Sequence, residues 1–175
     1  MEMPGQTYLF NLSLLAITFS TVSALVMLLR QTMGGKLSNF DVYLVNAYVS
    51  YGFVVAIAAI VPPLIAQCAL PEQLMWIAAS GLAAVILGVR VVQTIRQRLA
   101  VVKSPMPAAL KAFFAVEGIA VLLFLSDAAL PAWRGAAVFD LALTIAFANI
   151  LWSFVRRIST LLDDRPEDDW DPKRG

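Results

Sequence analysis

The sequence contains no histidine and only one cysteine, Cys68. Without histidine we expect no His-ligated haem or metal, no His proton relay and no His-dependent triad. A single cysteine excludes an intrachain disulfide and a cysteine metal cluster, so Cys68 is interpreted as an apolar filler near a helix end. The phosphate loop, the G-x-G-x-x-G fingerprint and the G-x-S-x-G elbow are also missing. The sequence therefore predicts no cofactor, no metal site and no enzymatic activity.

Charged residues are scarce and unevenly placed. They make up 14% of the 175 residues, whereas hydrophobic residues make up 60%, and the mean hydropathy is +0.78. A soluble domain has about 25% charged and about 45–50% apolar residues. The apolar excess lies in five long blocks, and nearly all charges lie between them. This pattern is typical of a polytopic membrane protein.

The five apolar blocks predict an all-α bundle of transmembrane helices. The expected helices are 8–29, 41–65, 74–99, 108–130 and 136–155. Each has about 20 residues or more, enough to cross roughly 30 Å of hydrocarbon. Ser38 and Asp41 form an S-x-x-D pattern that would cap the second helix, and Pro62-Pro63 would kink or end it. The N-terminus has no positive region or cleavage motif, so we expect the first block to be a retained helix.

The basic residues predict which side each loop faces. Twelve of the 13 Lys and Arg fall in or beside the first linker, the third linker and the C-terminal tail, and Arg134 alone falls on the opposite side. The twelve are Arg30, Lys36, Arg90, Arg96, Arg98, Lys103, Lys111, Arg156, Arg157, Arg165, Lys173 and Arg174. The positive-inside rule then places the N-terminus outside and the C-terminus in the cytoplasm of a bacterial inner membrane. Interfacial aromatics agree: Trp76 and Trp133 fall at the outer boundary, and Trp152 and Tyr43 near the inner one.

Two regions follow from this pattern: a transmembrane domain over 1–157 and an acidic cytoplasmic tail over 158–175. The tail carries Asp163, Asp164, Glu167, Asp168, Asp169 and Asp171. Such a run is typical of a solvated chain end. The alternatives are a docking segment anchored by Trp170 and a ring of negative charge beneath an oligomeric pore.

Small residues recur at helical spacing in four of the five helices. Close packing of small residues holds membrane helices together, so these rows predict helix contacts. The main rows are Ser80, Ala84 and Gly88 in the third helix and Gly52, Ala56 and Ala59 in the second. The first helix carries Ser13, Ala16, Ser20 and Ser23, and the fifth carries Ala142, Ala146, Asn149 and Ser153. Small-residue rows that contact no other helix of the same chain would pack against helices of another copy, which favours a homo-oligomer.

Four helices place a polar group at a similar depth on the cytoplasmic side. These groups are Glu117, Arg90, Asn46 and Asn149. Glu117 lies about nine residues into its helix from the cytoplasmic side, at a depth of roughly 13 Å. Arg90 lies about nine residues before the cytoplasmic end of its own helix, at a similar depth. We expect Glu117 to pair with Arg90, because charges in hydrocarbon face protein or water rather than lipid. The pair is interpreted as structural, fixing helix register; alternatively, Glu117 lines a water-filled ion path or Arg90 snorkels to the surface.

A second polar set lies toward the outer side. It contains Asp127, Asp140, Thr144 one turn after Asp140, and Asn11 at a comparable height. Repeated around a symmetry axis, Asp127 or Asp140 would form an acidic ring that attracts cations. The alternative is that both acids are wetted interfacial residues or cap short turns.

The first helix is rich in hydroxyl groups, namely Ser13, Thr18, Ser20, Thr21 and Ser23. Such residues hydrogen-bond to their own helix backbone, so placing their hydroxyl groups in lipid costs little free energy. The alternative is that this helix lines a hydrated lumen.

Two functions are consistent with these features. The first is a homo-oligomeric ion channel or pore that leans toward cations, favoured by two polar layers at different depths. The second is a non-transporting anchor, assembly or sensor subunit that acts through a partner protein. A membrane enzyme acting on lipid through Asp127 and Asp140 is a distant third. The expected partners are membrane lipids and further copies of the chain, and the basic linker indicates contact with lipid headgroups rather than nucleic acid.

Overall fold

Five long α-helices form the structure. The computed structural model describes residues 3, 5–32, 39–68, 70–101 and 105–162, and no strand occurs within them. The helices are α1 (Gln6–Thr32), α2 (Asn39–Ala66), α3 (Glu72–Val101), α4 (Ala108–Ala129) and α5 (Ala136–Leu162). Each is long and apolar enough to cross a membrane. The predicted all-α, five-helix architecture is therefore confirmed, and the protein is an integral membrane protein.

The helix bounds differ from the predicted ranges mainly at the ends. α5 continues to Leu162, past the expected end at residue 155. α2 continues through Pro62 and Pro63 to Ala66, so these prolines do not end it. Each proline lacks a backbone N–H and so removes one helical hydrogen bond, which weakens the helix here without ending it. The predicted Ser38–Asp41 cap and the acidic residues of the tail lie outside the side chains that the structure describes.

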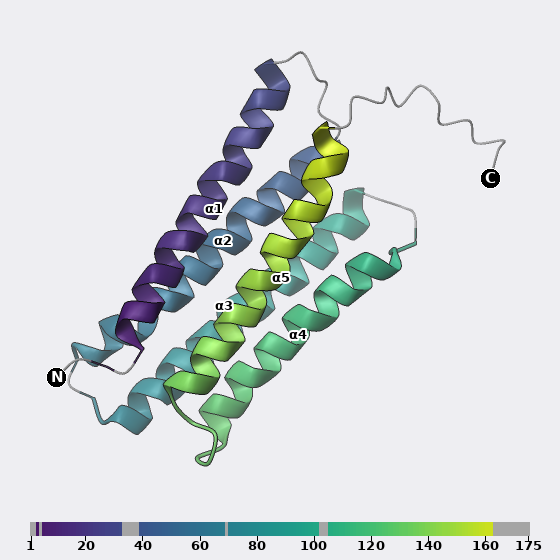
Figure 1. Ribbon diagram of the computed structural model, residues 1–175. Helices are drawn as coiled ribbons and strands as arrows, with labels where there is room; N and C mark the ends of the chain where they lie inside the picture. Colours follow the sequence, from purple (N-terminus) through teal and green to yellow (C-terminus); the bar gives the residue numbers. More distant parts are fainter. Residues whose placement is uncertain (1–2, 4, 33–38, 69, 102–104, 163–175) are drawn as a thin grey trace.

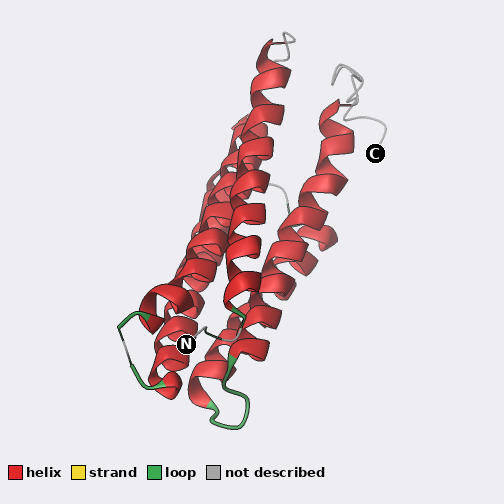
Figure 2. Cartoon of the chain, turned by 60° about the vertical axis from the view of Figure 1, so that its left-hand side comes forward, coloured by secondary structure: helices red, strands yellow, loops and turns green. Residues whose placement is uncertain are grey.

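The helices run alternately up and down and form one bundle (Figures 1 and 2). Consecutive helices are neighbours along the chain, and α2 also contacts α5 across the middle. α1 packs extensively on α2 but only slightly on α5. We call the end where α1 begins the N-side of the bundle, and the end where α1, α3 and α5 finish the C-side. The start of α1 and the end of α5 lie at these opposite ends (Figure 1).

Small residues bring α1 and α2 close together. Gly52 lies against α1 so closely that a Cβ atom there would be 3.0 Å from the Ala16 carbonyl oxygen and would overlap the Ser20 hydroxyl. Ser13 Oγ donates a hydrogen bond to the Ala56 carbonyl across the interface (3.2 Å). Ser20 Oγ lies 3.2 Å from the Val49 carbonyl in the same way. Close backbone approach and interhelical hydrogen bonds are the two interactions that stabilise helix pairs in lipid.

The small-residue row of α3 faces the interior of the bundle. Ser80 and Ala84 are buried, and the Cα side of Gly88 faces Val121 of α4, from which an added Cβ would be 4.0 Å away. Toward the N-side, Trp76 packs on Phe139, whose ring also lies 5.1 Å from that of Phe124. Trp76 is only 2% exposed. The prediction that it anchors the bundle at the outer boundary is therefore wrong, because its ring fills the space between α3 and α5.

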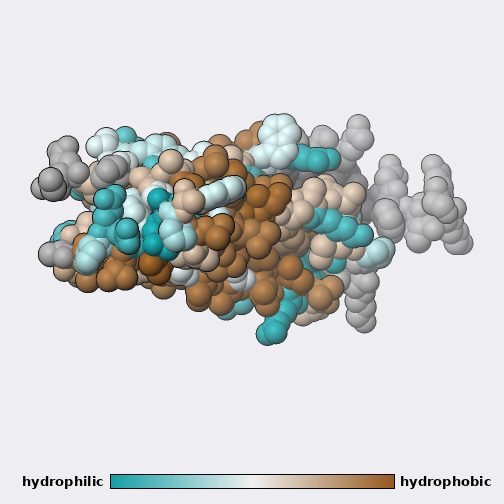
Figure 3. All heavy atoms as spheres, turned by 90° about the horizontal axis from the view of Figure 1, so that it is seen from below, coloured by the Kyte–Doolittle hydropathy of each residue, from teal (hydrophilic) through white to brown (hydrophobic). Residues whose placement is uncertain are grey.

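The outer surface of the bundle carries the apolar side chains that no helix covers. Leu14, Leu64, Val85 and Leu122 are all more than half exposed. In Figure 3 hydrophobic residues gather along the middle of the visible face, and hydrophilic residues lie toward both ends. An exposed apolar belt of this kind is what a lipid-facing surface requires.

Candidate functional site

Glu117 is completely buried between α4 and α5. Its Oε1 accepts a hydrogen bond from Asn149 Nδ2 at 2.8 Å. The same Asn149 nitrogen donates to the Phe113 carbonyl at 3.0 Å, one turn earlier in α4. Glu117 Oε2 is also buried and has no hydrogen-bond partner. The amide of Asn149 is thus the hydrogen-bond donor to the buried carboxyl group, and it joins the two helices there.

Arg90 does not pair with Glu117, so the predicted ion pair is corrected. Arg90 is 8% exposed, and its guanidinium carbon lies 5.4 Å from the centre of the Tyr51 ring. Its Nη2 reaches the backbone carbonyl of Asn46 at 3.5 Å. The Tyr51 ring also packs on Phe113 of α4, one turn before Glu117, with 5.8 Å between the ring centres. The physical reason for the difference is therefore an aromatic ring from α2 that lies beside Arg90 and packs on α4.

Asn46 contributes its backbone rather than its side chain to this layer. The residue is exposed, on the same outward face of α2 as Val42 and Phe53. Its carbonyl accepts a 2.6 Å hydrogen bond from Ser50 Oγ in addition to the Arg90 contact. The predicted layer of four polar side chains is therefore two separate pairs: Glu117 with Asn149, and Arg90 with the backbone at Asn46.

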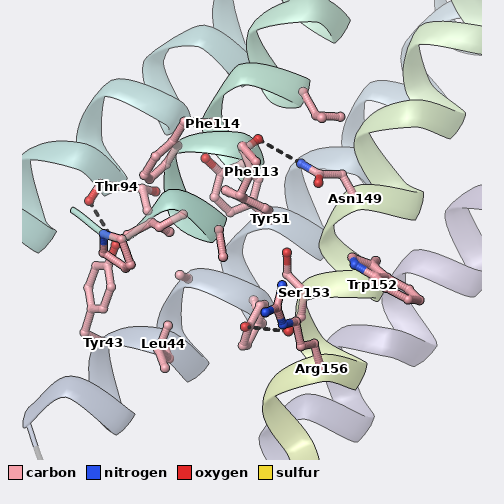
Figure 4. A pocket seen from close by; sticks show the side chains of 17 residues that line it. Tyr43, Leu44, Tyr51, Thr94, Phe113, Phe114, Asn149, Trp152, Ser153 and Arg156 are labelled. Atoms are coloured by element: carbon pink, nitrogen blue, oxygen red, sulfur yellow. Dashed lines mark hydrogen bonds between the residues drawn. The ribbon is translucent and has the colours of Figure 1, made fainter.

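A cavity of ≈ 530 Å³ opens beside these pairs, toward the C-side of the bundle (Figure 4). Residues from α2, α4 and α5 surround it, and Thr94 of α3 completes the wall. Its aromatic lining residues are Tyr43, Tyr48, Tyr51, Phe113, Phe114 and Trp152. Of these residues only Tyr43 and Trp152 were singled out from the sequence, as membrane-interface aromatics. The run Leu44, Ala47, Tyr48 and Tyr51 lies on one face of α2 by helical spacing, which was a usable signal.

Most polar groups in the cavity wall already donate their protons to backbone carbonyls. Tyr43 donates to the Thr94 carbonyl (3.1 Å), and Tyr48 donates to the Ser153 carbonyl (3.2 Å). Thr94 Oγ1 donates to the Arg90 carbonyl at 2.9 Å. The oxygens of these groups keep acceptor capacity toward the cavity, but their donors are used.

Asp127 joins α3 to the turn between α4 and α5. One carboxylate oxygen accepts a hydrogen bond from Ser80 Oγ, and the other accepts one from the Gly135 backbone N–H at 2.8 Å. Arg134 adds bonds from its side chain to the Asp127 and Ala128 carbonyls. Asp127 is fully buried, so it is neither a wetted interfacial residue nor part of a surface within this chain. Gly135 has φ of +150°, which favours glycine at this turn.

Asp140 and Thr144 lie in a different place, where α5 meets the start of α1. Thr144 Oγ1 donates to the Asp140 carbonyl, and the Tyr8 hydroxyl bonds to Thr144 Oγ1; each distance is 2.5 Å. Asp140 is half-buried, and its Oδ1 has no hydrogen-bond partner. Asp127 and Asp140 therefore have separate environments within one chain and do not form a shared acidic site.

The hydroxyl groups of α1 bond mainly to their own helix. Thr18, Ser20, Thr21 and Ser23 each donate to the carbonyl four residues earlier, at 2.8–3.0 Å. Ser20 and Ser23 are buried, whereas Thr18 and Thr21 are exposed. Helical spacing places Thr18 and Thr21 on the same outer face of α1 as the exposed residues Thr7 and Asn11. We call Thr7, Asn11, Thr18 and Thr21 the α1 stripe.

Metal ligands do not gather among the residues that the structure describes: no group of three or more Cys, Asp or Glu side chains is positioned to hold an ion. Searches against protein-family models, curated proteins and solved structures found no match to this chain.

Proposed function

We propose that the protein is a homo-oligomeric ion channel of a bacterial inner membrane, leaning toward cations and lined by the α1 stripe. The observation that supports this proposal is the stripe itself. Polar side chains at membrane depth usually face protein or a water-filled cavity, and no other helix of this chain covers these four.

The chemistry of the stripe favours cations. Thr18 and Thr21 donate their hydroxyl protons to the Leu14 and Ile17 carbonyls of their own helix. Their oxygens therefore keep acceptor capacity. Acceptor oxygens of this kind replace part of the hydration shell of a passing cation, as backbone carbonyls do in selectivity filters.

The position of α1 explains why several copies are needed. The charged groups inside the bundle are enclosed: Glu117 and Asp127 are completely buried, and Arg90 is 8% exposed. A single chain thus offers little room for an ion path of its own. α1 lies at the edge of the bundle, attached chiefly to α2. Copies arranged around an axis with α1 inward would bring their stripes together around one lumen.

The charges support an orientation with the N-side outside and the C-side in the cytoplasm. Among the side chains described, Arg90, Arg96, Arg98, Lys111 and Arg156 lie in the C-side halves of their helices, and Arg134 lies at the N-side. Lys and Arg are concentrated on the cytoplasmic side of bacterial membrane proteins.

The decisive experiment measures conductance after reconstitution. The Thr18→Val/Thr21→Val double variant keeps side-chain shape but removes both hydroxyl oxygens, so we expect cation conductance of the purified protein in liposomes to fall by roughly tenfold or more. Ser50→Ala is the matched control, because the Ser50 hydroxyl makes the same bond to the carbonyl four residues earlier, on α2. Ser50→Ala is expected to conduct as the unmodified chain does. Absence of conductance in every chain at all potentials, or equal conductance in both variants, would refute the proposal.

A second candidate is a non-transporting membrane subunit that acts through a partner protein. The exposed Asn46 beside Arg90 favours it, because an amide on a lipid-facing helix face provides a hydrogen-bonding contact for another helix. A monomeric protein in detergent that passes no ions and co-purifies stoichiometrically with one membrane protein would support this candidate instead. Neither candidate involves catalysis or nucleic acid.

A further inference from the structure

We propose that the cavity between α2, α4 and α5 binds an acyl-chain amphiphile with an anionic head group, with the chain among the aromatic side chains and the head at Arg156. This inference goes beyond the proposed channel and does not depend on it. The sources of such a ligand are a free long-chain fatty acid and a chain of an anionic phospholipid, which share this chemistry.

The size and walls of the cavity suit an acyl chain. Its volume of ≈ 530 Å³ lies within the range of about 300–1,000 Å³ found for small-molecule sites. Phe113, Phe114 and the rings of Tyr48 and Tyr51 line it, together with Leu44 and Val116. Figure 4 shows the labelled side chains of Leu44, Tyr51, Phe113 and Phe114 around a common space. Apolar surface of this kind stabilises a hydrocarbon chain by burial.

The interior is poorly suited to an anionic head group. The hydroxyl protons of Tyr43, Tyr48 and Thr94 are donated to backbone carbonyls. Both donors of Asn149 are directed to the Phe113 carbonyl and to Glu117. Apart from the buried Tyr51 hydroxyl, which has no hydrogen-bond partner, these donors are used within the protein, and none of these groups carries a positive charge that would attract a carboxylate or phosphate. A ligand with an anionic head must enter with its chain first.

The cavity edge at the C-side has the complementary charge. Of the described residues that line the cavity, Arg156 alone is charged, and it is exposed. It lies one helical turn beyond Trp152, which is 68% exposed. A guanidinium binds a carboxylate or phosphate through two parallel hydrogen bonds, and arginine next to tryptophan is typical of the membrane–water interface. The apolar wall of the cavity therefore lies inside and the positive charge lies at its edge, which matches an amphiphile whose acyl chain enters first and whose anionic head group stays outside.

Fluorescence of Trp152 tests the site directly, because bromine atoms quench a nearby indole. Full-length protein in nanodiscs of unbrominated lipid is titrated with 9,10-dibromostearate, and Trp152→Phe identifies the part of the signal that Trp152 contributes. We expect saturable quenching of that part. Ala112→Phe fills the cavity and is expected to abolish it, whereas Ala115→Phe leaves it unchanged. Both alanines are exposed on α4, but only Ala112 lines the cavity. Ala109→Phe is a second filling variant, in case Ala112→Phe does not fold.

The charge of the head group is tested separately. Arg156→Gln is expected to weaken dibromostearate binding roughly tenfold, as expected for loss of a charge-assisted hydrogen bond, and to leave binding of its methyl ester unchanged. Lys111→Gln, a basic residue on α4 that does not line the cavity, is the control and retains affinity. A parallel titration with brominated phosphatidylglycerol identifies the source: saturable quenching that Ala112→Phe removes assigns the site to phospholipid. Quenching that never saturates, or that is equal in the Ala112→Phe and Ala115→Phe variants for both ligands, overturns the proposal.

Discussion

Asn149 of α5 holds the carboxyl group of Glu117 on α4 through a hydrogen bond of 2.8 Å. The second carboxyl oxygen has no partner, so this one amide provides the whole hydrogen-bonding environment of a completely buried acid. Asn149 therefore joins the two neighbouring helices through two hydrogen bonds, this one and the bond of 3.0 Å to the Phe113 carbonyl.

Replacing Asn149 by leucine should destabilise the bundle by about 1–3 kcal/mol, because it leaves Glu117 buried without any partner. The free energy of unfolding, measured by denaturant titration in detergent, checks this value. Glu117→Leu in the same chain removes the orphaned group, so the double variant should be more stable than the sum of the single losses implies. Ser153→Ala, one turn further along α5, is the control and should change stability by less than about 0.5 kcal/mol. Additive losses at Asn149 and Glu117 would contradict the contact.

Tyr51 should matter through its ring rather than its hydroxyl. The Arg90 guanidinium lies over the ring, and the hydroxyl is buried without a hydrogen-bond partner. Tyr51→Phe should therefore preserve stability, whereas Tyr51→Leu should lose about 1–2 kcal/mol from the cation–π contact and from packing. Thermal unfolding of the two variants side by side gives the measurement. Equal stability of the two variants would show that the ring makes no specific contribution.

Gly52 and Gly81 provide a matched pair of helical glycines. A Cβ at Gly52 would press on the Ala16 carbonyl and Ser20, whereas a Cβ at Gly81 meets nothing within 4 Å. Gly52→Ala should separate α1 from α2 and cost about 1–3 kcal/mol. Gly81→Ala should be neutral or stabilising by up to about 1 kcal/mol, since it lowers the entropy of the unfolded chain. Unfolding free energies decide the matter, and a loss at Gly81 equal to that at Gly52 would count against the close approach.

Cys68 allows the proposed orientation to be tested with a native residue. It is exposed and lies just after α2, at the N-side of the bundle. A membrane-impermeant maleimide should label it in cells whose inner membrane is intact. In a Cys68→Ser background, Met106→Cys, just before α4, should react only after the membrane is permeabilised. The reverse pattern would place the C-side outside and would overturn the orientation.

Helix positions were predictable from the sequence, whereas helix rotations were not. Uninterrupted apolar blocks fix where a helix must cross a membrane, so α4 begins at residue 108 as expected. The depth of a residue along a helix can also be estimated from the sequence, and on this basis Glu117 and Asn149 were predicted to lie in one layer. The direction of a side chain around the helix axis depends on packing with neighbours. Asn46 therefore turned outward, and the ring of Tyr51 came to lie beside Arg90.

The cavity escaped prediction for the same reason. It arises from the way α4 approaches α2 and α5, which no single segment specifies. Tyr48 and Phe113 read in the sequence as ordinary apolar residues of their helices, and only their meeting across helices reveals a shared wall.

The one-sided attachment of α1 has a consequence for biogenesis. The hydroxyl groups of Ser13 and Ser20 reach carbonyl groups of α2, and Ser20 also bonds to the Ala16 carbonyl of its own helix. We therefore expect the first hairpin, α1 with α2, to pack together in the membrane before the remaining three helices are inserted. Because α3, α4 and α5 make few contacts with α1, an α1 that lost its place during synthesis would leave the rest of the protein assembled, and a copy supplied as a separate peptide should be able to restore it.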